Sequence, residues 1–266
     1  MLGLLSRRPA AGPAPAYARC STPEDPALTT HPPLEIVRDT PVERIPLGDG
    51  RSWVELRRGF ARSPQPLLDE ALSSIEWMQG EIWRFDRYVE ERRLGAWIRP
   101  DGLGGGRLGT AVRQTGLHLE SAYRVRFSGV SAILYRDGQD FQGLHSDREM
   151  KWLDDTLIAI LVLGEPRPFR LRPRGSWTDP AARADAGSDV VVRPGHGDLL
   201  VMGGRAQRDW MHGVPLDVTT RPRISITWRW TSRRGRPDTG PSYFDGRHFS
   251  DRPRVPGHRF RRTGGS

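Results

Sequence analysis

The chain has 266 residues, of which 36% are hydrophobic and nine are tryptophan, and this composition excludes a wholly disordered protein. Its single cysteine, Cys20, excludes an internal disulfide and fits a reducing compartment, so a cytoplasmic location is expected. No stretch reaches the roughly 20 apolar residues that a membrane helix needs, so no membrane association is expected.

The formal net charge is +9 at pH 7, which favours a polyanionic partner such as nucleic acid. Lys151 is the only lysine, so nearly all of the positive charge is arginine. This arginine bias, together with many Gly, Pro and Ala residues, is also explained by the base composition of the coding DNA. The charge alone therefore does not identify the partner.

Residues 1–33 are rich in proline and alanine, and this composition predicts a disordered tail. The first twenty residues contain arginine and no acidic residue, as organellar transit peptides do. Their prolines disfavour the amphipathic helix of such a peptide, so we interpret the segment as a tail.

Residues 34–128 form an N-terminal extension for which mixed α and β structure is expected. Short strands are predicted at residues 34–37 and 53–56. Apolar residues at helical spacing predict an amphipathic helix over residues 66–78. The glycine-rich residues 101–106 predict a loop.

Between residues 81 and 97, aromatic side chains alternate with arginines, among them Trp97, Arg92 and Arg93. Aromatic rings stack on bases and guanidinium groups pair with phosphates, so this stretch suits nucleic-acid binding. A pair of core-facing strands with solvated charges explains the same pattern equally well.

Residues 129–232 contain a series of short strands separated by Gly and Pro turns. The continuous apolar run at residues 157–163 suits a strand in a sheet that is buried on both faces. Further strands at residues 131–135, 169–172, 190–193 and 198–202 favour a sandwich or a jelly roll. Residues 233–266 form an Arg-, Gly- and Pro-rich C-terminal tail whose last dozen residues are expected to fray.

His145 and Asp147 are two residues apart, so on an extended segment both side chains point to the same face. A second imidazole, His212, is brought in by a later predicted strand. Two imidazoles and one carboxylate make a facial triad that leaves positions free on an octahedral Fe(II). A surface pair or a hydrogen-bonded couple is the alternative for His145 and Asp147, and Zn²⁺ is an alternative metal.

Residues 223–230 alternate strictly between polar and apolar side chains. This period of two predicts a strand with one face on a core and the other lining a polar cavity. Arg223 and Arg229 lie on the polar face, about 20 Å apart along an extended strand. Two guanidinium groups so placed suit a small dicarboxylate. The alternative is a solvated face with two surface arginines, or Arg229 as a structural ion-pair partner.

The order and spacing of five sequence blocks within residues 131–230 resemble the AlkB-like 2-oxoglutarate/Fe(II)-dependent dioxygenases. These blocks are residues 134–138, 145–147, 197–202, 207–212 and 222–229. The resemblance implies a mostly β fold, a double-stranded β-helix or jelly roll, in residues 129–232. It also implies that residues 34–128 act as a nucleotide-recognition lid.

The resemblance further implies the cofactors and the residues that hold them. Fe(II) would be bound by the catalytic residues His145, Asp147 and His212, with 2-oxoglutarate and O2 as co-substrates. The residues expected to contact 2-oxoglutarate are Tyr135, Arg223, Ser225 and Arg229. Those expected to contact the substrate base or its strand are Glu149, Trp97, Arg93 and Arg92.

Two positions depart from the family pattern in the co-substrate site. Ile133 stands where the family usually has an asparagine two residues before the tyrosine, and Ser225 replaces an asparagine two residues after the first clamp arginine. Both asparagines help position 2-oxoglutarate, so its binding is expected to be weaker or rearranged. Arg148 also replaces a commonly acidic residue.

Three hypotheses follow. The first is a monomeric demethylase that removes N-alkyl groups from bases in DNA or RNA and releases formaldehyde, succinate and CO2. The second is a 2-oxoglutarate-dependent hydroxylase or demethylase of a protein or a small molecule. The third, suggested by Ile133 and Ser225, is a catalytically silent binding protein on the same scaffold.

Overall fold

The computed structural model describes residues 35–84, 87–98, 103, 105–127, 129–148, 150–151, 153–175, 189–232 and 259–262. The predicted N-terminal tail lies outside these residues, as do Glu149 and most of the predicted C-terminal tail. No helix among the described residues is both long and apolar enough to cross a membrane.

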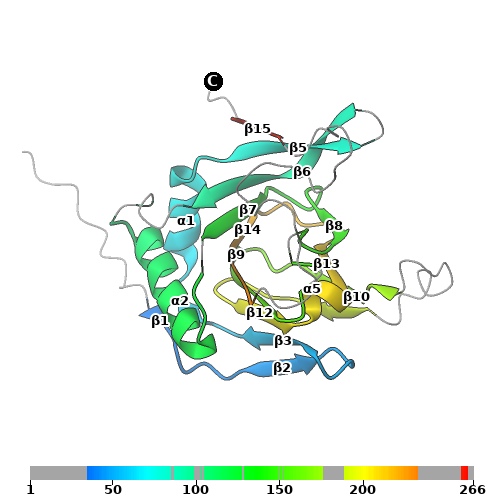
Figure 1. The fold of residues 1–266 in the computed structure, drawn as a ribbon. Coiled ribbons are helices and arrows are strands. Elements are labelled where there is room, and N and C mark those ends of the chain that lie inside the picture. The colour runs from blue at the N-terminus through cyan, green and yellow to red at the C-terminus, as the bar shows by residue number, and fades with distance from the viewer. Residues whose placement is uncertain are drawn as a thin grey trace, which may run out of the picture. The chain divides into compact units, whose positions relative to one another are not determined.

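Two antiparallel sheets face each other and form the body of the fold (Figure 1). The larger sheet has, in order, β15 (Arg259–Arg262), β5 (Met78–Arg84), β6 (Arg87–Ile98), β7 (Val130–Tyr135), β14 (Arg223–Thr231), β9 (Thr156–Gly164), β12 (Leu199–Gly204), β3 (Ser52–Arg57) and β2 (Glu43–Pro46). The smaller sheet has β11 (Val190–Val192), β10 (Phe169–Pro173), β13 (Trp210–Val214) and β8 (Gln142–His145). β1 (Glu35–Ile36) and β4 (Ala61–Arg62) form a separate short pair. The predicted β-rich jelly roll is confirmed.

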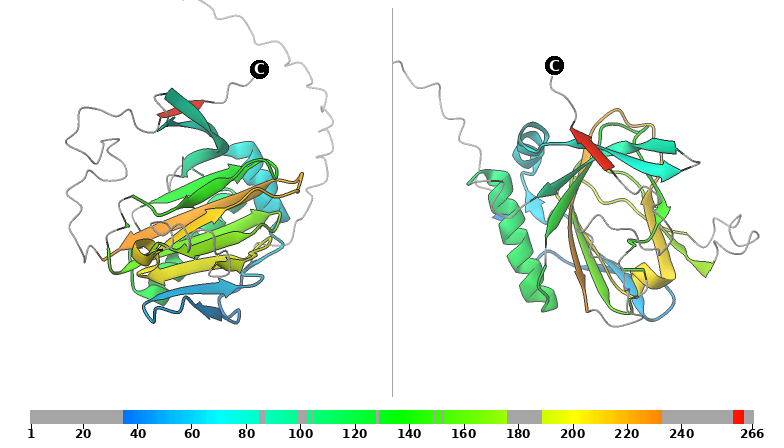
Figure 2. Two further views of the ribbon diagram at one scale, coloured as in Figure 1. Left: turned by 90° about the vertical axis from the view of Figure 1, so that its right-hand side faces the viewer. Right: turned by 45° about the horizontal axis from the view of Figure 1, so that its top comes forward.

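The helices α1 (Gln65–Ser74) and α2 (Arg107–Tyr123) lie on the outer face of the large sheet, opposite the small sheet (Figure 2). A short helix, α5 (Ala206–Asp209), leads from β12 into β13. The large sheet is therefore covered on both faces, and each of its central strands buries both sets of side chains.

β9 shows this double burial directly. Leu157 and Leu161 belong to the core beneath the helices, whereas Ile158 and Ile160 belong to the core between the sheets. The expectation from the continuous apolar run is confirmed. β14 is also as expected, because Ile224 and its apolar neighbours face the helices and its polar residues face the space between the sheets.

Three local predictions need correction. The first helix ends at Ser74 rather than residue 78, because Met78 begins β5. Helix α2 was not anticipated, although Leu108, Val112 and Leu119 are buried on its sheet-facing side. Residues 259–262 do not fray but pair as β15 with Met78–Glu81 of β5.

The predicted extension is hydrogen-bonded into the jelly roll on both sides. β6 pairs with β7, and β3 pairs with β12. The strands before residue 128 thus extend the large sheet from its two edges.

Candidate active site

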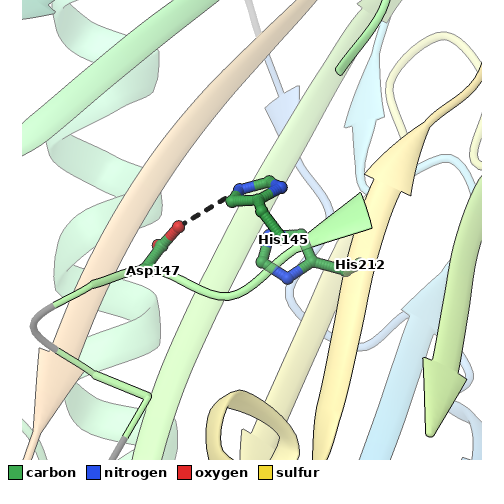
Figure 3. A group of neighbouring side chains, drawn as sticks. All are labelled: His145, Asp147 and His212. Atoms are coloured by element: carbon green, nitrogen blue, oxygen red, sulfur yellow. Dashed lines mark ion pairs between the residues drawn. The ribbon is translucent and has the colours of Figure 1, made fainter. Parts of the chain in front are cut away.

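The two histidines of the predicted triad meet across the small sheet. His145 at the end of β8 is the cross-strand partner of His212 on β13, and their ring centroids are 4.3 Å apart. Asp147 follows just beyond β8, with its Oδ1 3.3 Å from His145 Nε2 (Figure 3). One ligand atom from each side chain lies within 4.8 Å of the others. The predicted proximity of these three residues is confirmed.

The protonation states of this group suit a divalent cation. Burial lowers the pKa of His212 to about 3, helped by the nearby His145. Burial alone would raise the pKa of Asp147, but Arg229, His145 and His212 hold it well below its usual value. The site thus presents a neutral imidazole and a carboxylate at neutral pH, which are the forms that bind metal.

Arg229 fixes the carboxylate of the triad. Its Nε donates to Asp147 Oδ2 at 2.7 Å, and its Nη1 donates to Ser131 Oγ at 2.6 Å. One carboxylate oxygen is thereby held by the guanidinium, while Oδ1 faces His145. Arg229 therefore has the ion-pair role left open by the sequence, and it also lines the cavity.

Two glutamines connect the triad to its surroundings. The side-chain oxygen of Gln207 on α5 accepts from the backbone N–H of Asp147 at 2.8 Å, and its amide nitrogen lies 3.4 Å from His212 Nδ1. The amide nitrogen of Gln142 lies 2.8 Å from His145 Nε2, and its oxygen accepts from Tyr135 Oη at 3.3 Å. Gln207 is the kind of outer partner that orients metal ligands, whereas Gln142 contacts the same His145 nitrogen that faces Asp147. The role of Gln142 was missed, although it precedes His145 by only three residues on the same strand.

Arg223 is the most unusual side chain of the site. It is completely buried, and none of its three guanidinium nitrogens has a hydrogen-bond partner among the described residues. Its cross-strand neighbours are Tyr135 on β7, whose ring centroid is 5.8 Å from the guanidinium carbon, and Gly164 on β9. Burial lowers its pKa to about 10, so it stays charged at neutral pH.

A buried, unpaired guanidinium costs several kcal/mol unless an anion neutralises it. The described residues place no carboxylate against Arg223, so the arrangement fits an anionic ligand. The distal carboxylate of 2-oxoglutarate has the charge and the planar shape that a guanidinium binds.

A cavity lies between the two sheets, beside the triad. Its lining includes both histidines of the triad, Arg229, Tyr135 and Gln142, with apolar walls. Ile133, Ser225 and Thr227 also line it. The polar face of β14 therefore lines a cavity, as its alternation predicted.

Three of the four predicted substrate residues, Arg92, Arg93 and Trp97, lie on β6, which pairs with the cavity strand β7. Gly95 is the cross-strand partner of Ile133, and Trp97 is the partner of Ser131. Trp97 is thus on the cavity face of the sheet, where it is 40% exposed. Strand alternation places Arg93 on the same face and Arg92 on the opposite one.

Arg93 and Arg92 also differ in their surroundings. Arg93 donates to Glu91 at 2.7 Å and is mostly buried, whereas Arg92 is exposed. The geometry therefore supports Arg93 and Trp97 better than Arg92 as neighbours of a bound base. Glu149 lies outside the described residues.

Comparison with known proteins agrees with this site. Residues 115–229 match the model of the 2OG-Fe(II) oxygenase superfamily. The human alpha-ketoglutarate-dependent dioxygenase alkB homolog 3 is 27% identical over 222 residues, which are 74% of this chain and 76% of the human protein. The mouse alkB homolog 3 is 34% identical over 193 residues, 68% of this chain and 66% of its own length.

A third relative matches over a shorter stretch. The bovine DNA oxidative demethylase ALKBH2 is 32% identical over 105 residues, 39% of this chain and 37% of its own length. These similarities accompany a jelly roll with a His-Asp-His group and a buried arginine clamp. The chain belongs to the AlkB-like family of 2-oxoglutarate- and Fe(II)-dependent dioxygenases.

Proposed function

We propose that this enzyme is an oxidative demethylase of N-alkylated bases in nucleic acid, with DNA as the first candidate and RNA as the second. The proposal rests above all on two features: the His-Asp-His group, both of whose histidines line the cavity, and the buried, unpaired guanidinium of Arg223, which lies beside the cavity residue Tyr135. The name of the bovine relative, a DNA oxidative demethylase, adds support. Cys20, the only cysteine, suits action in the cytoplasm, and we propose a monomer there.

In this proposal His145, Asp147 and His212 hold Fe(II). The bound iron supplies oxygen activation, with 2-oxoglutarate giving succinate and CO2. Arg229 and Gln207 keep the carboxylate and the second histidine oriented through the contacts described above. Their part is to hold the ligands in the deprotonated forms that metal binding needs.

Arg223 holds the distal carboxylate of 2-oxoglutarate, beside the Tyr135 ring. Ser225, two residues along β14, lines the cavity between Arg223 and Arg229. Arg229 completes the positively charged side of the cavity, while its bond to Asp147 keeps it in place. The apolar wall formed by Ile158, Ile160 and Phe169 excludes water from the bound ligand.

The base must leave the base stack of the nucleic acid before it can enter this cavity. It is either flipped from a duplex or presented on a single strand, and an N-methyl lesion that weakens pairing lowers the cost. In this proposal Trp97 stacks on the base or its neighbour, Arg93 contacts the strand on the same face, and Glu149 accepts from an exocyclic amine. Hydroxylation of the N-methyl group gives a carbinolamine that releases formaldehyde.

Formaldehyde release from methylated oligonucleotides tests the proposal. Matched DNA and RNA strands carrying one N-methylated base are incubated with the full chain, Fe(II), ascorbate and 2-oxoglutarate. Demethylation of either polymer is expected. The Asp147→Ala variant should lose iron and all turnover. Asp39 is exposed and is not part of the triad, so the Asp39→Ala variant should behave like the parent.

Two outcomes would contradict the proposal. Turnover of 2-oxoglutarate without nucleic-acid binding or demethylation would favour a protein or small-molecule substrate. No turnover of 2-oxoglutarate at all, in iron-loaded protein, would favour a silent binding protein.

A further inference from the structure

The turn between β2 and β3 contacts the strand that carries the second histidine of the triad. In this turn, residues 47–52, Asp49 Oδ1 accepts from the backbone N–H groups of Arg51 at 2.8 Å and Ser52 at 2.6 Å. The other carboxylate oxygen, Oδ2, accepts from the indole Nε1–H of Trp210 at 2.9 Å. One carboxylate therefore closes a turn of the N-terminal extension and also holds a side chain of the small sheet.

Trp210 is in turn bonded to the segment that bears the other two triad residues. It is 6% exposed and lies two residues before His212 on β13, so both side chains project from the same face of the strand. Its backbone carbonyl accepts from Ser146 Oγ at 2.9 Å, and Ser146 stands between His145 and Asp147. Trp210 thus contacts the turn through its indole and the triad segment through its backbone.

The turn also contacts α5. The backbone N–H of Arg205, at the start of α5, donates to the Arg51 carbonyl at 3.2 Å. α5 carries Gln207, whose side-chain oxygen accepts from the backbone N–H of Asp147. Residues 205–210 are therefore bonded to the turn at both ends, and they supply two groups that bond to the triad segment.

The Asp49 carboxylate is ionised at neutral pH and keeps both of its oxygens as acceptors. Burial raises the pKa of the Asp49 carboxyl, but hydrogen bonds from Ser52, Arg51 and Trp210 outweigh burial and lower it to about 2. Hydrogen bonds to an ionised acceptor are stronger than those to a neutral one. The indole of Trp210 is therefore held by a charged partner from the extension.

We propose that Asp49 is a positioning residue for the metal site, because it fixes Trp210 and, through Trp210, the segment that carries His145 and Asp147. This inference rests on the proposed Fe(II) site and adds a residue of the N-terminal extension to it. Removing a direct partner of a metal ligand commonly weakens metal binding roughly 10- to 100-fold. Asp49 acts from one residue further out, so a smaller effect is expected.

The Asp49→Asn variant tests the contact with Trp210 by itself. The amide oxygen can still accept from the two backbone N–H groups of the turn, but the amide nitrogen then faces the indole N–H, and two donors cannot bond. Asp137→Asn is the matched control. Asp137 Oδ1 accepts from the backbone N–H groups of Gln139 and Asp140, in a turn of the same kind that does not hold Trp210, and this variant loses the same charge.

Co(II) is the probe, because it is a divalent ion that the same ligands bind and that does not oxidise in air. Calorimetric titration of the full chain measures its affinity, and the absorption spectrum of bound Co(II) reports the ligand geometry. Asp49→Asn is expected to weaken Co(II) binding roughly three- to tenfold and to change the spectrum. Asp137→Asn should do neither. Urea unfolding of the metal-free proteins measures stability separately.

A second substitution shows whether Asp49 acts through the tryptophan. Trp210→Phe keeps a buried ring but removes the indole N–H, so it should weaken Co(II) binding to a similar extent. The Asp49→Asn/Trp210→Phe double variant should then bind Co(II) no more weakly than the weaker of the two single variants, because both changes remove the same contact.

Four results would overturn the inference while leaving the metal site intact. These are an unchanged Co(II) affinity and spectrum in Asp49→Asn, a loss of stability alone in that variant, an equal loss of affinity in Asp137→Asn, or additive losses in the double variant. A parent protein that binds no Co(II) would instead contradict the proposed metal site and this inference together. The parent's own titration therefore distinguishes the two failures.

Discussion

Ile133 on β7 and Ser225 on β14 are direct cross-strand partners, and both line the cavity. These are the two positions at which the chain departs from the asparagines of its family. The two departures therefore meet at one place in the co-substrate site, two residues along each strand from the pair of Tyr135 and Arg223. An apolar side chain and a hydroxyl together replace two amides there.

Restoring both asparagines should tighten 2-oxoglutarate binding. The Ile133→Asn/Ser225→Asn double variant adds amide donors to this wall, and each new hydrogen bond contributes about 0.5–1.5 kcal/mol. We expect the apparent KM for 2-oxoglutarate to fall about five- to tenfold. The free-energy effects of the two single substitutions on 2-oxoglutarate binding should not add up to that of the double variant, because neighbouring residues are coupled.

Steady-state decarboxylation measures this change, with Thr227→Asn as the control on the same strand face. An unchanged KM in the double variant would show that the missing amides do not weaken co-substrate binding in this chain. A stronger effect of Thr227→Asn would place the ligand further along the strand.

Period-two patterns made the catalytic half of the fold predictable from sequence. On β14 every second residue is apolar, so the two faces are separable without a structure. His145 and Asp147 are also two apart, and the register of β8 with β13 brings His212 beside them. These features depend on residues that are close in sequence, or on residues of adjacent strands that strand pairing brings together.

Helix α2 was not predictable in the same way, because Gly109 and Gly116 are poor helix formers. Packing explains one of them. A Cβ atom at position 116 would lie 3.3 Å from the Trp228 indole nitrogen, so the small residue allows the helix to approach the sheet closely. Tertiary contact thus outweighs local propensity here.

The pairing of β15 and the part played by Arg167 depend on contacts that are distant in sequence. The residues paired by β15 and β5 are more than 175 positions apart. Arg167 is completely buried and donates to three backbone carbonyls, those of Asp137, Asp140 and Pro215. No spacing pattern marks either arrangement.

Arg223→Met should separate ligand binding from folding. The parent without ligand carries a buried, unpaired guanidinium, so replacing it by an apolar side chain of similar length should leave the free energy of unfolding unchanged or raise it. With iron and 2-oxoglutarate at 100 times Kd, the parent should gain about 2.7 kcal/mol, and the variant should gain far less.

Urea unfolding with and without 2-oxoglutarate checks this expectation, and Arg221→Met, whose side chain is 81% exposed, is the control. A variant that is strongly destabilised without ligand, yet keeps the full gain on adding it, would show that Arg223 has a structural partner rather than a ligand.

Arg167→Met should destabilise the fold and make the position of Tyr135 in the co-substrate site less fixed. Its guanidinium carbon lies 5.2 Å from the Tyr135 ring centroid, on a side chain whose hydrogen bonds join two loops. Leaving one buried and two partly buried carbonyls without their charged donor should cost about 3–5 kcal/mol. The KM for 2-oxoglutarate should rise, since Tyr135 loses its support.

The neighbouring Arg170→Met is the matched control, because its side chain is 40% exposed and pairs with Asp189. A loss of stability in Arg167→Met without any change in KM would limit Arg167 to a structural role. Equal effects of both variants on stability and KM would show that the buried Arg167 contributes no more than the partly exposed Arg170.

His196 should make the protein less stable as the pH falls below about 6.5. Burial lowers its pKa in the folded state, and its Nδ1 accepts from the backbone N–H of Gly164 at 2.9 Å, which requires the neutral ring. Below the unfolded pKa of 6.5, the unfolded chain binds a proton that the folded protein does not bind. Stability is therefore complete above this pH and declines as the pH drops towards the lowered folded pKa.

The His196→Gln variant should reduce this decline, because a glutamine oxygen can accept the same N–H without titrating. One proton contributes at most about 1.4 kcal/mol per pH unit to the slope. Urea unfolding at pH 7.5, 6.5 and 5.5 measures it in both proteins. Part of the slope should persist in the variant, since burial also lowers the pKa of His118. Identical slopes in parent and variant would show that His196 is protonated equally in the folded and unfolded states, and that its bond to Gly164 does not depend on pH.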